Sequence, residues 1–235
     1  MKKLPLSIQT FSEIVQKNYL YVDKTRDILE LMTTGKYLFL SRPRRFGKSL
    51  LISTLKAIFA GQQDLFNGLF IYDQIEWRPH PVIHLDLSVI DYATPQELRE
   101  GLIYALRRIG KEYHIETEPQ GFKTYFQNIL RGLAEKYDKV AVLIDEYDKP
   151  IIDFVDQPAR AFANREVLKD FYGVLKGSDE YLRFVFLTGV SKFSRVSVFS
   201  GLNNLQDITL SPKFATLLVH NFVNSDTTFF DRKRG

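Results

Sequence analysis

The sequence predicts an α/β fold, a three-layer sandwich with a mainly parallel sheet. Short apolar runs alternate along the chain with longer stretches in which apolar residues recur at helical spacing. Several of the apolar runs are continuous, as in strands that are buried on both faces of a parallel sheet. Strands that alternate with helices favour parallel pairing through crossover connections.

The length of 235 residues suits one domain, which we place at residues 1–211, followed by a tail at 212–235. With 45% hydrophobic and 26% charged residues, the composition is that of a folded globular protein. No apolar run approaches the ~18 residues that a membrane span needs, so we expect no membrane association. The absence of cysteine excludes disulfides and cysteine-based zinc sites, and the default location is cytoplasmic.

In the first quarter of the chain, residues 4–22 predict a lead-in of mixed structure and residues 23–35 a short amphipathic helix ending at Gly35. The apolar run KYLFLS at 36–41 predicts a buried strand. The helix expected after residue 49 has apolar residues at helical spacing, namely Leu50, Leu51, Leu55 and Ile58. This order is strand, loop, helix.

The remaining elements follow the same alternation. Strands are predicted at 81–88, 139–147, 182–190 and 205–211, and helices at 95–113, 122–137 and 164–175. Pro95 suits a first helical turn behind Thr94 as the cap. The run at 139–147 ends in acidic residues, which places carboxylates at the carboxyl end of a buried strand.

The loop RPRRFGKS at 42–49 matches the second half of the phosphate-loop pattern, with Arg42 at the first glycine position. In such loops backbone N–H groups and a helix N-terminus hold phosphates, a lysine reaches the β- and γ-phosphates and a hydroxyl holds Mg²⁺. The alternative is a surface turn, but the position between strand and helix favours a P-loop NTPase sandwich. The predicted nucleotide-binding residues are Arg44, Arg45, Phe46, Gly47, Lys48, Ser49 and Leu50.

An acidic pair follows the strand at 139–147. Asp145 is predicted to hold Mg²⁺ together with Ser49, and Glu146 to polarise the attacking water. The alternative is that both acids merely end a strand. For Asp148 and Lys149 a turn or a salt bridge is the expected role.

The strand at 182–190 ends in Thr188, which is predicted to sense the γ-phosphate. In nucleoside triphosphatases with an inserted strand, a polar group at this place lies between the two nucleotide-binding motifs. A hydroxyl that satisfies backbone groups is the alternative. Lys192 and Arg195 follow and could reach a phosphate, and Arg195 is included among the predicted catalytic residues with Glu146, Lys48 and Thr188.

Four segments together resemble the AAA-ATPase-like family of bacterial P-loop proteins: YVDKT at 21–25, RPRRFGKSLL, LIDEYDKPI and FLTGVSKFSRVSVFSGLNNL. The resemblance covers residues 4–215 and implies an ATPase core of the additional-strand class, related to AAA+ and STAND ATPases. It also implies a helical region and a C-terminal PD-(D/E)XK nuclease-like domain, which are expected to be absent from this chain. In related ATPases the positions of residues 21–25 contact the adenine.

The predicted function is ATP binding with Mg²⁺-dependent hydrolysis that drives a conformational switch. The alternatives are a nucleotide-dependent kinase, a nucleotide-binding module without turnover, and the regulatory ATPase part of a nucleic-acid-processing protein. A protein partner or self-association through the apolar segments 214–218 and 229–230 is also expected. The net charge of +4 allows a nucleic-acid partner, but no helix carries a basic stripe.

Overall fold

The computed structural model describes residues 2–118, 121–191, 198–199, 202, 204–215 and 217. Within these residues five strands form a single sheet in which every pairing is parallel: β1 (Tyr37–Ser41), β2 (Val82–Asp86), β3 (Val140–Asp145), β4 (Leu182–Gly189) and β5 (Gln206–Asp207). Their order across the sheet is β2-β3-β4-β1-β5. The late strand β4 therefore lies between β1 and β3. The α/β fold with a parallel sheet is confirmed.

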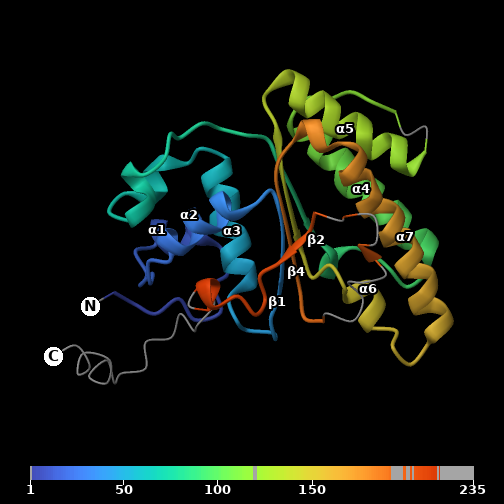
Figure 1. Cartoon of the computed structure of the whole chain (residues 1–235), viewed down its shortest axis with the longest axis horizontal. Helices are drawn as coiled ribbons and strands as arrows, with labels where there is room; N and C mark the ends of the chain where they lie inside the picture. The colour runs from blue at the N-terminus through green and yellow to red at the C-terminus, as the bar shows by residue number, and fades with distance from the viewer. Residues whose placement is uncertain are drawn as a thin grey trace.

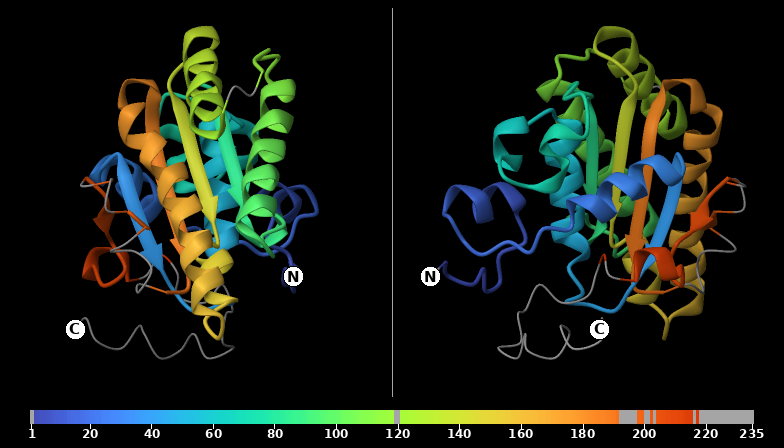
Figure 2. Two further views of the ribbon diagram at one scale, coloured as in Figure 1. Left: turned by 90° about the vertical axis from the view of Figure 1, so that its right-hand side faces the viewer. Right: turned by 60° about the vertical axis from the view of Figure 1, so that its left-hand side comes forward.

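Helices cover both faces of the sheet (Figure 1). One face carries α1 (Phe11–Gln16), α2 (Thr25–Thr34) and α3 (Lys48–Phe59). The other carries α4 (Pro95–Glu112), α5 (Phe122–Lys136) and α7 (Pro158–Gly177), which pack side by side (Figure 2). The short α6 (Lys149–Ile152) follows β3, and single 3₁₀ turns are formed by η1 (Gln63–Phe66), η2 (Phe70–Asp73), η3 (Leu87–Val89), η4 (Asp179–Tyr181) and η5 (Pro212–Phe214).

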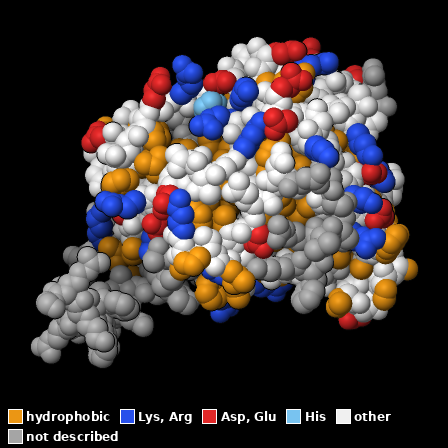
Figure 3. All heavy atoms as spheres, viewed as in Figure 1, with side chains coloured by type: hydrophobic (Ala, Val, Ile, Leu, Met, Phe, Trp, Pro, Cys, Tyr) orange, Lys and Arg blue, Asp and Glu red, His pale blue; other side chains and the backbone are white. Residues whose placement is uncertain are grey.

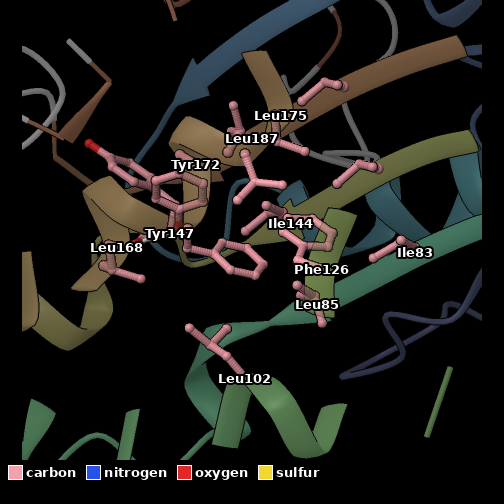
Figure 4. Packing of buried hydrophobic residues seen from close by; sticks show 14 of the residues in the cluster. Ile83, Leu85, Leu102, Phe126, Ile144, Tyr147, Leu168, Tyr172, Leu175 and Leu187 are labelled. Carbon is pink, nitrogen blue, oxygen red and sulfur yellow. Dashed lines mark hydrogen bonds between the residues drawn. The ribbon is translucent and has the colours of Figure 1, made fainter. Parts of the chain in front are cut away.

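Strand residues alternate between two hydrophobic clusters, one on each face of the sheet. Phe39, Val142 and Val185 pack under α4, α5 and α7, whereas Leu38, Leu143 and Phe186 pack under α1, α2 and α3. Figure 4 shows side chains from the α4–α5–α7 layer, Leu102, Phe126 and Leu168 among them, directed at the strands. Burial on both faces explains why the strands appear as continuous apolar runs in the sequence.

Several predicted boundaries need correction. The helix predicted at 164–175 begins at Pro158, a residue that suits a first helical turn. The prediction missed this start because the side chains of that turn are largely exposed and give no apolar pattern. The strand predicted at 205–211 is reduced to Gln206–Asp207, since the chain turns where the Ser211 N–H donates to the Ile208 carbonyl. The helices α1 and α6 are too short to show a period in the sequence.

Phe214 and Leu217, from the segment predicted to be a tail, are buried in the cluster under α1 and α3. Lys213 beside them forms an ion pair with Glu30 of α2, 2.9 Å between Nζ and Oε1. The expectation that residues 214–218 present an apolar patch is therefore wrong for these two side chains, because the fold covers them. Residues 229–230, the other predicted patch, lie outside the described residues.

On the face shown in Figure 3, lysine and arginine side chains are interspersed with aspartate and glutamate. This view shows no single basic area of the kind that tracks a nucleic-acid backbone. In the part of the chain that the structure describes, no helix is long and apolar enough to cross a membrane.

Candidate functional site

The loop predicted to bind phosphate begins where β1 ends and finishes at Gly47, the N-cap of α3. Gly47 has a φ of 78°, in the left-handed region where glycine avoids the strain of a side chain. Arg45 also adopts positive φ, 69°, at a cost of roughly 1–3 kcal/mol for a residue with a Cβ. The loop is thus bent so that Lys48 and Ser49 become the first two residues of α3.

Lys48 is almost fully buried, with 4% of its surface exposed. Its Nζ donates to the carbonyl oxygens of Arg42 at 3.0 Å and Pro43 at 3.2 Å, and lies 4.0 Å from Oε1 of Glu146. A buried ammonium needs such oxygen partners. The ammonium group is therefore held inside the loop, facing the acid that follows β3.

Asp145, the last residue of β3, is 2% exposed and accepts hydrogen bonds from three directions. The Ser49 hydroxyl donates to Oδ2 at 2.6 Å, the backbone N–H of Glu146 donates to Oδ1 at 3.0 Å, and the Thr188 hydroxyl also donates to Oδ1. The serine, the threonine and the acid come from three neighbouring elements. Thr188 reaches Asp145 because β4 pairs with both β1 and β3.

Glu146 has a φ of 53°, a left-handed conformation that strains a residue with a Cβ. Its side chain is 18% exposed and lines the same cavity as the loop. Strained residues cluster at functional sites, where the surrounding structure holds them in place. The turn after Asp145 therefore directs two successive acids differently, one into the hydrogen-bond network and one toward Lys48.

A cavity of about 610 Å³ opens in front of the loop, within the ~300–1,000 Å³ range of small-molecule sites. Its lining falls into three parts. The loop and α3 contribute Arg44, Arg45, Phe46, Gly47, Lys48, Ser49, Leu50, Leu51 and Thr54; the N-terminal segments contribute Leu4, Pro5, Ser7, Ile8, Gln9, Tyr21, Lys24 and Ile28; and Glu146 and Leu217 complete it.

All seven predicted nucleotide-binding residues line this cavity, and Asp145 and Thr188 adjoin it through the Ser49 network. Arg195 and Lys192 lie outside the described residues. Residues 4–5, residues 7–9 and Leu217 also line the cavity and were not predicted. Their segments have no periodicity and no motif, and only the tertiary structure brings them to the loop.

The segment YVDKT divides between two roles. Tyr21 and Lys24 line the cavity, and burial raises the pKa of the Tyr21 hydroxyl. Asp23 does not line it. Its Oδ1 accepts the Thr25 N–H at 2.8 Å and its Oδ2 the Phe70 N–H at 2.7 Å, which ties the start of α2 to η2.

The described residues contain no group of three or more histidine and acidic side chains that could enclose a metal by themselves. The hydroxyl of Ser49 and the carboxylate of Asp145 are nevertheless hard oxygen donors in direct contact. Such a pair suits Mg²⁺, which is commonly held by one or two protein ligands together with water and phosphate oxygens. The two residues thus fit a metal that arrives with a phosphate ligand.

Asp148 is fully buried, and its carboxylate accepts the Ser191 N–H at 2.6 Å and the Val190 N–H at 3.2 Å. The expectation of a local turn or salt bridge misses this tie to the end of β4, because the partners are more than 40 residues away. For Lys149 the predicted salt bridge is present, 2.6 Å from Nζ to Oδ2 of Asp153.

Burial raises the pKa of Asp148 from 3.8 to about 6, and the Glu146 charge adds to the shift. The folded protein therefore holds this proton where the unfolded chain has released it, so stability falls as the pH rises through this interval. Near pH 7 the free energy of unfolding of Asp148→Asn should exceed that of wild type by about 3 kcal/mol, and its unfolding temperature should be higher, with the difference disappearing below about pH 4. Thermal unfolding across this range measures it.

Asp179 is the matched control for that experiment. Hydrogen bonds from Lys36 and Tyr37 lower its pKa, so its stabilising contribution is present at neutral pH and is lost in acid. Asp179→Asn should therefore be the less stable protein at neutral pH, with the gap closing as the pH falls. Parallel pH curves for wild type and Asp148→Asn would contradict the prediction for Asp148.

The chain is 43% identical over 232 residues to a protein of Azotobacter chroococcum mcd 1 described as "Uncharacterized protein in vnfD 5'region". The match covers 97% of this chain but 45% of that protein, so the chain spans about half the length of this relative. No solved structure matches significantly. The family model described as Predicted AAA-ATPase matches residues 5–199, and the chain belongs to this AAA-ATPase-like family.

Proposed function

We propose that this chain binds ATP with Mg²⁺ and hydrolyses it, using the cavity in front of the phosphate-binding loop. One observation carries the proposal. The fold brings Lys48, the Ser49–Asp145 pair and Glu146 together at one cavity, although the loop and the acids are almost 100 residues apart in the chain. Membership of the AAA-ATPase-like family supports nucleotide binding at this place.

The loop and Lys48 are proposed to hold the phosphates. The left-handed bend at Gly47 places the N-terminus of α3 at the cavity, where backbone N–H groups and the helix dipole favour anions. Lys48 Nζ now bonds two loop carbonyls and has Glu146 nearby, so it is already oriented toward the cavity. Arg44 and Arg45 are exposed on the lining and add positive charge.

Ser49 and Asp145 are the proposed Mg²⁺ ligands. When bound, the ion would neutralise charge on the phosphate oxygens. Glu146 is proposed to accept a proton from the attacking water or to orient it, since its carboxylate faces the cavity while Asp145 is occupied by hydrogen bonds. Thr188 and Arg195 are proposed as sensors of the γ-phosphate, and Thr188 already donates to Asp145.

The apolar side of the cavity is proposed to receive the base. Leu4, Pro5, Ile8, Ile28 and Leu217 line it, and Tyr21 and Lys24 add polar groups that could read the base edge. The position of β4 between β1 and β3 supports assignment to the additional-strand class, with its AAA+ and STAND-like relatives. Through the Thr188–Asp145 contact, hydrolysis could be transmitted to β4 as a conformational switch.

Calorimetry with ATP, GTP and ADP, each with and without Mg²⁺, tests binding, and phosphate release without any acceptor tests hydrolysis. Tight binding with phosphate release supports an ATPase. Phosphate transfer that requires an added acceptor would point to a kinase, and bound ATP without turnover to a module that uses the nucleotide structurally. No binding of any nucleotide would contradict the proposal.

The role of Asp145 gives a further prediction. Asp145→Asn keeps the size of the side chain but removes its charge, so ATP affinity should respond much less to added Mg²⁺ than in wild type. Calorimetric titrations at several Mg²⁺ concentrations measure this response. Asp86→Asn is the matched control, because Asp86 ends the neighbouring strand β2 in register with Asp145 but binds Ser88. An unchanged Mg²⁺ response in Asp145→Asn would remove Asp145 from the metal site.

A further inference from the structure

The carboxyl end of β4 is held from both sides. The backbone N–H of Arg42, at the start of the loop, donates to the Gly189 carbonyl at 3.1 Å. The backbone N–H of Tyr147, two residues beyond Asp145, donates to the Thr188 carbonyl at 2.9 Å. The end of β4 therefore joins the phosphate-binding loop to the acidic turn.

Beyond Gly189 the chain is held by Tyr147 and Asp148. The Asp148 carboxylate accepts the N–H groups of Val190 and Ser191, and the Tyr147 hydroxyl donates to the Ser191 carbonyl at 2.8 Å. Contact is close, since a Cβ added at Gly189 would lie 2.5 Å from Asp148 Oδ1 and from the Tyr147 ring. Two adjacent side chains thus fix the backbone of residues 189–191.

A buried carboxylate is costly unless its hydrogen bonds compensate, and charge-assisted bonds to backbone N–H groups are short and directional. The surroundings of Asp148 are otherwise unfavourable to its charge. Burial, with a smaller contribution from the Glu146 carboxylate, raises its pKa. The Asp148 charge in turn adds to the burial that raises the pKa of Tyr172 on α7. Figure 4 shows Tyr172 beside Tyr147 in the core. Through these hydrogen bonds Asp148 fixes the position of the end of β4.

That position matters because Thr188 stands directly before Gly189. Its hydroxyl reaches Asp145 only while the end of β4 stays in register with β3, where Ile144 pairs with Leu187 one residue before each of them. Loss of the Asp148 acceptors would leave the N–H groups of Val190 and Ser191 without these partners and let the strand end shift. Displacements of about 1 Å can change a reaction rate ~10²-fold.

We propose that Asp148, assisted by the Tyr147 hydroxyl, is a positioning residue that holds Thr188 against Asp145 and thereby lets the site distinguish ATP from ADP. The inference rests on the proposed function. In that function the loop and Lys48 hold the phosphates that ATP and ADP share. The β4 end and Glu146 serve the terminal phosphate alone, so a displaced β4 end should weaken ATP binding selectively.

The test compares the affinities for ATP and ADP, both with Mg²⁺, by calorimetry on the full chain. Asp148→Ala should lower ATP affinity by about tenfold, the scale of a lost hydrogen bond to a charged group, and leave ADP affinity unchanged. Tyr147→Phe keeps the ring but removes the hydroxyl. It should also lower the ratio of ATP affinity to ADP affinity, by a smaller factor than Asp148→Ala does. Asp179→Ala is the matched control, because Asp179 binds Lys36 and Tyr37 near the opposite end of β4.

The expected result is a lower ATP-to-ADP affinity ratio in Asp148→Ala and a wild-type ratio in Asp179→Ala. Equal ratios in the two variants, or equal losses of ATP and ADP affinity in Asp148→Ala, would overturn the inference. Should Asp148→Ala fail to fold by circular dichroism, Tyr147→Phe decides, and a wild-type ratio in that variant overturns it. A wild-type chain that binds neither nucleotide would instead overturn the proposed function, and this inference with it.

Discussion

Glu146→Gln should still bind ATP with Mg²⁺ but release phosphate ~10²-fold more slowly or worse, the scale expected when a general base is lost. The substitution keeps the shape of the side chain and removes the charge that would polarise water. Glu146 lines the cavity, and its carboxylate lies 4.0 Å from Lys48 Nζ. Because its strained backbone conformation is unchanged by the substitution, the fold should be retained. Phosphate release and calorimetry on the same preparation separate the two effects.

Glu166→Gln is the matched control for that experiment. Glu166 lies on α7 and pairs with Arg165 at 3.0 Å on the surface, where a lost ion pair has little consequence. It should hydrolyse ATP at the wild-type rate. Wild-type turnover by Glu146→Gln would show that Glu146 is only an acid at the end of a strand.

Lys48→Ala should reduce ATP affinity by about tenfold or more, since charge-assisted hydrogen bonds contribute ~1.5–3 kcal/mol each. The variant also removes the donor to the carbonyls of Arg42 and Pro43, so the loop should become less ordered in the protein without nucleotide. The core does not depend on this side chain. Calorimetry measures the affinity, and circular dichroism checks that the fold is intact.

Lys56→Ala controls for the loss of a positive charge on the same helix. Lys56 lies on α3 but is exposed and does not line the cavity. ATP affinity in this variant should match wild type. If Lys48→Ala also binds ATP as wild type does, the loop at 42–49 is not a phosphate-binding loop.

Much of the architecture could be predicted because its signals are local. A continuous apolar run predicts a buried strand wherever its neighbours lie, and the four longer strands are found where these runs predict them. Thr94 as cap and Pro95 behind it likewise predicted the start of α4, where the structure adds a capping box with Glu97. Short helices such as α1 and α6 span fewer than two turns, which is too short for a helical repeat of apolar residues to appear. Nothing in their sequence therefore distinguishes them from loops.

The candidate site divides in the same way. The strand, loop and helix around Gly47, Lys48 and Ser49 are contiguous, so residue types and spacing were enough to predict the loop. The acidic pair could be recognised because it ends an apolar strand. That the Ser49 hydroxyl contacts Asp145 follows from the order of strands in the sheet, which adjacent residues do not encode.

The sequence by itself determined the α/β alternation, the loop between β1 and α3 and the acids at the end of β3, because each depends on neighbours within a few residues. Only the tertiary structure decided which distant segments complete the site. Residues 4–5, residues 7–9 and Leu217 join the cavity, Phe214 is buried, and Asp148 holds residues 190–191. These contacts arise because burying apolar surface and pairing buried polar groups are requirements of the whole chain, and many local sequences satisfy them equally well.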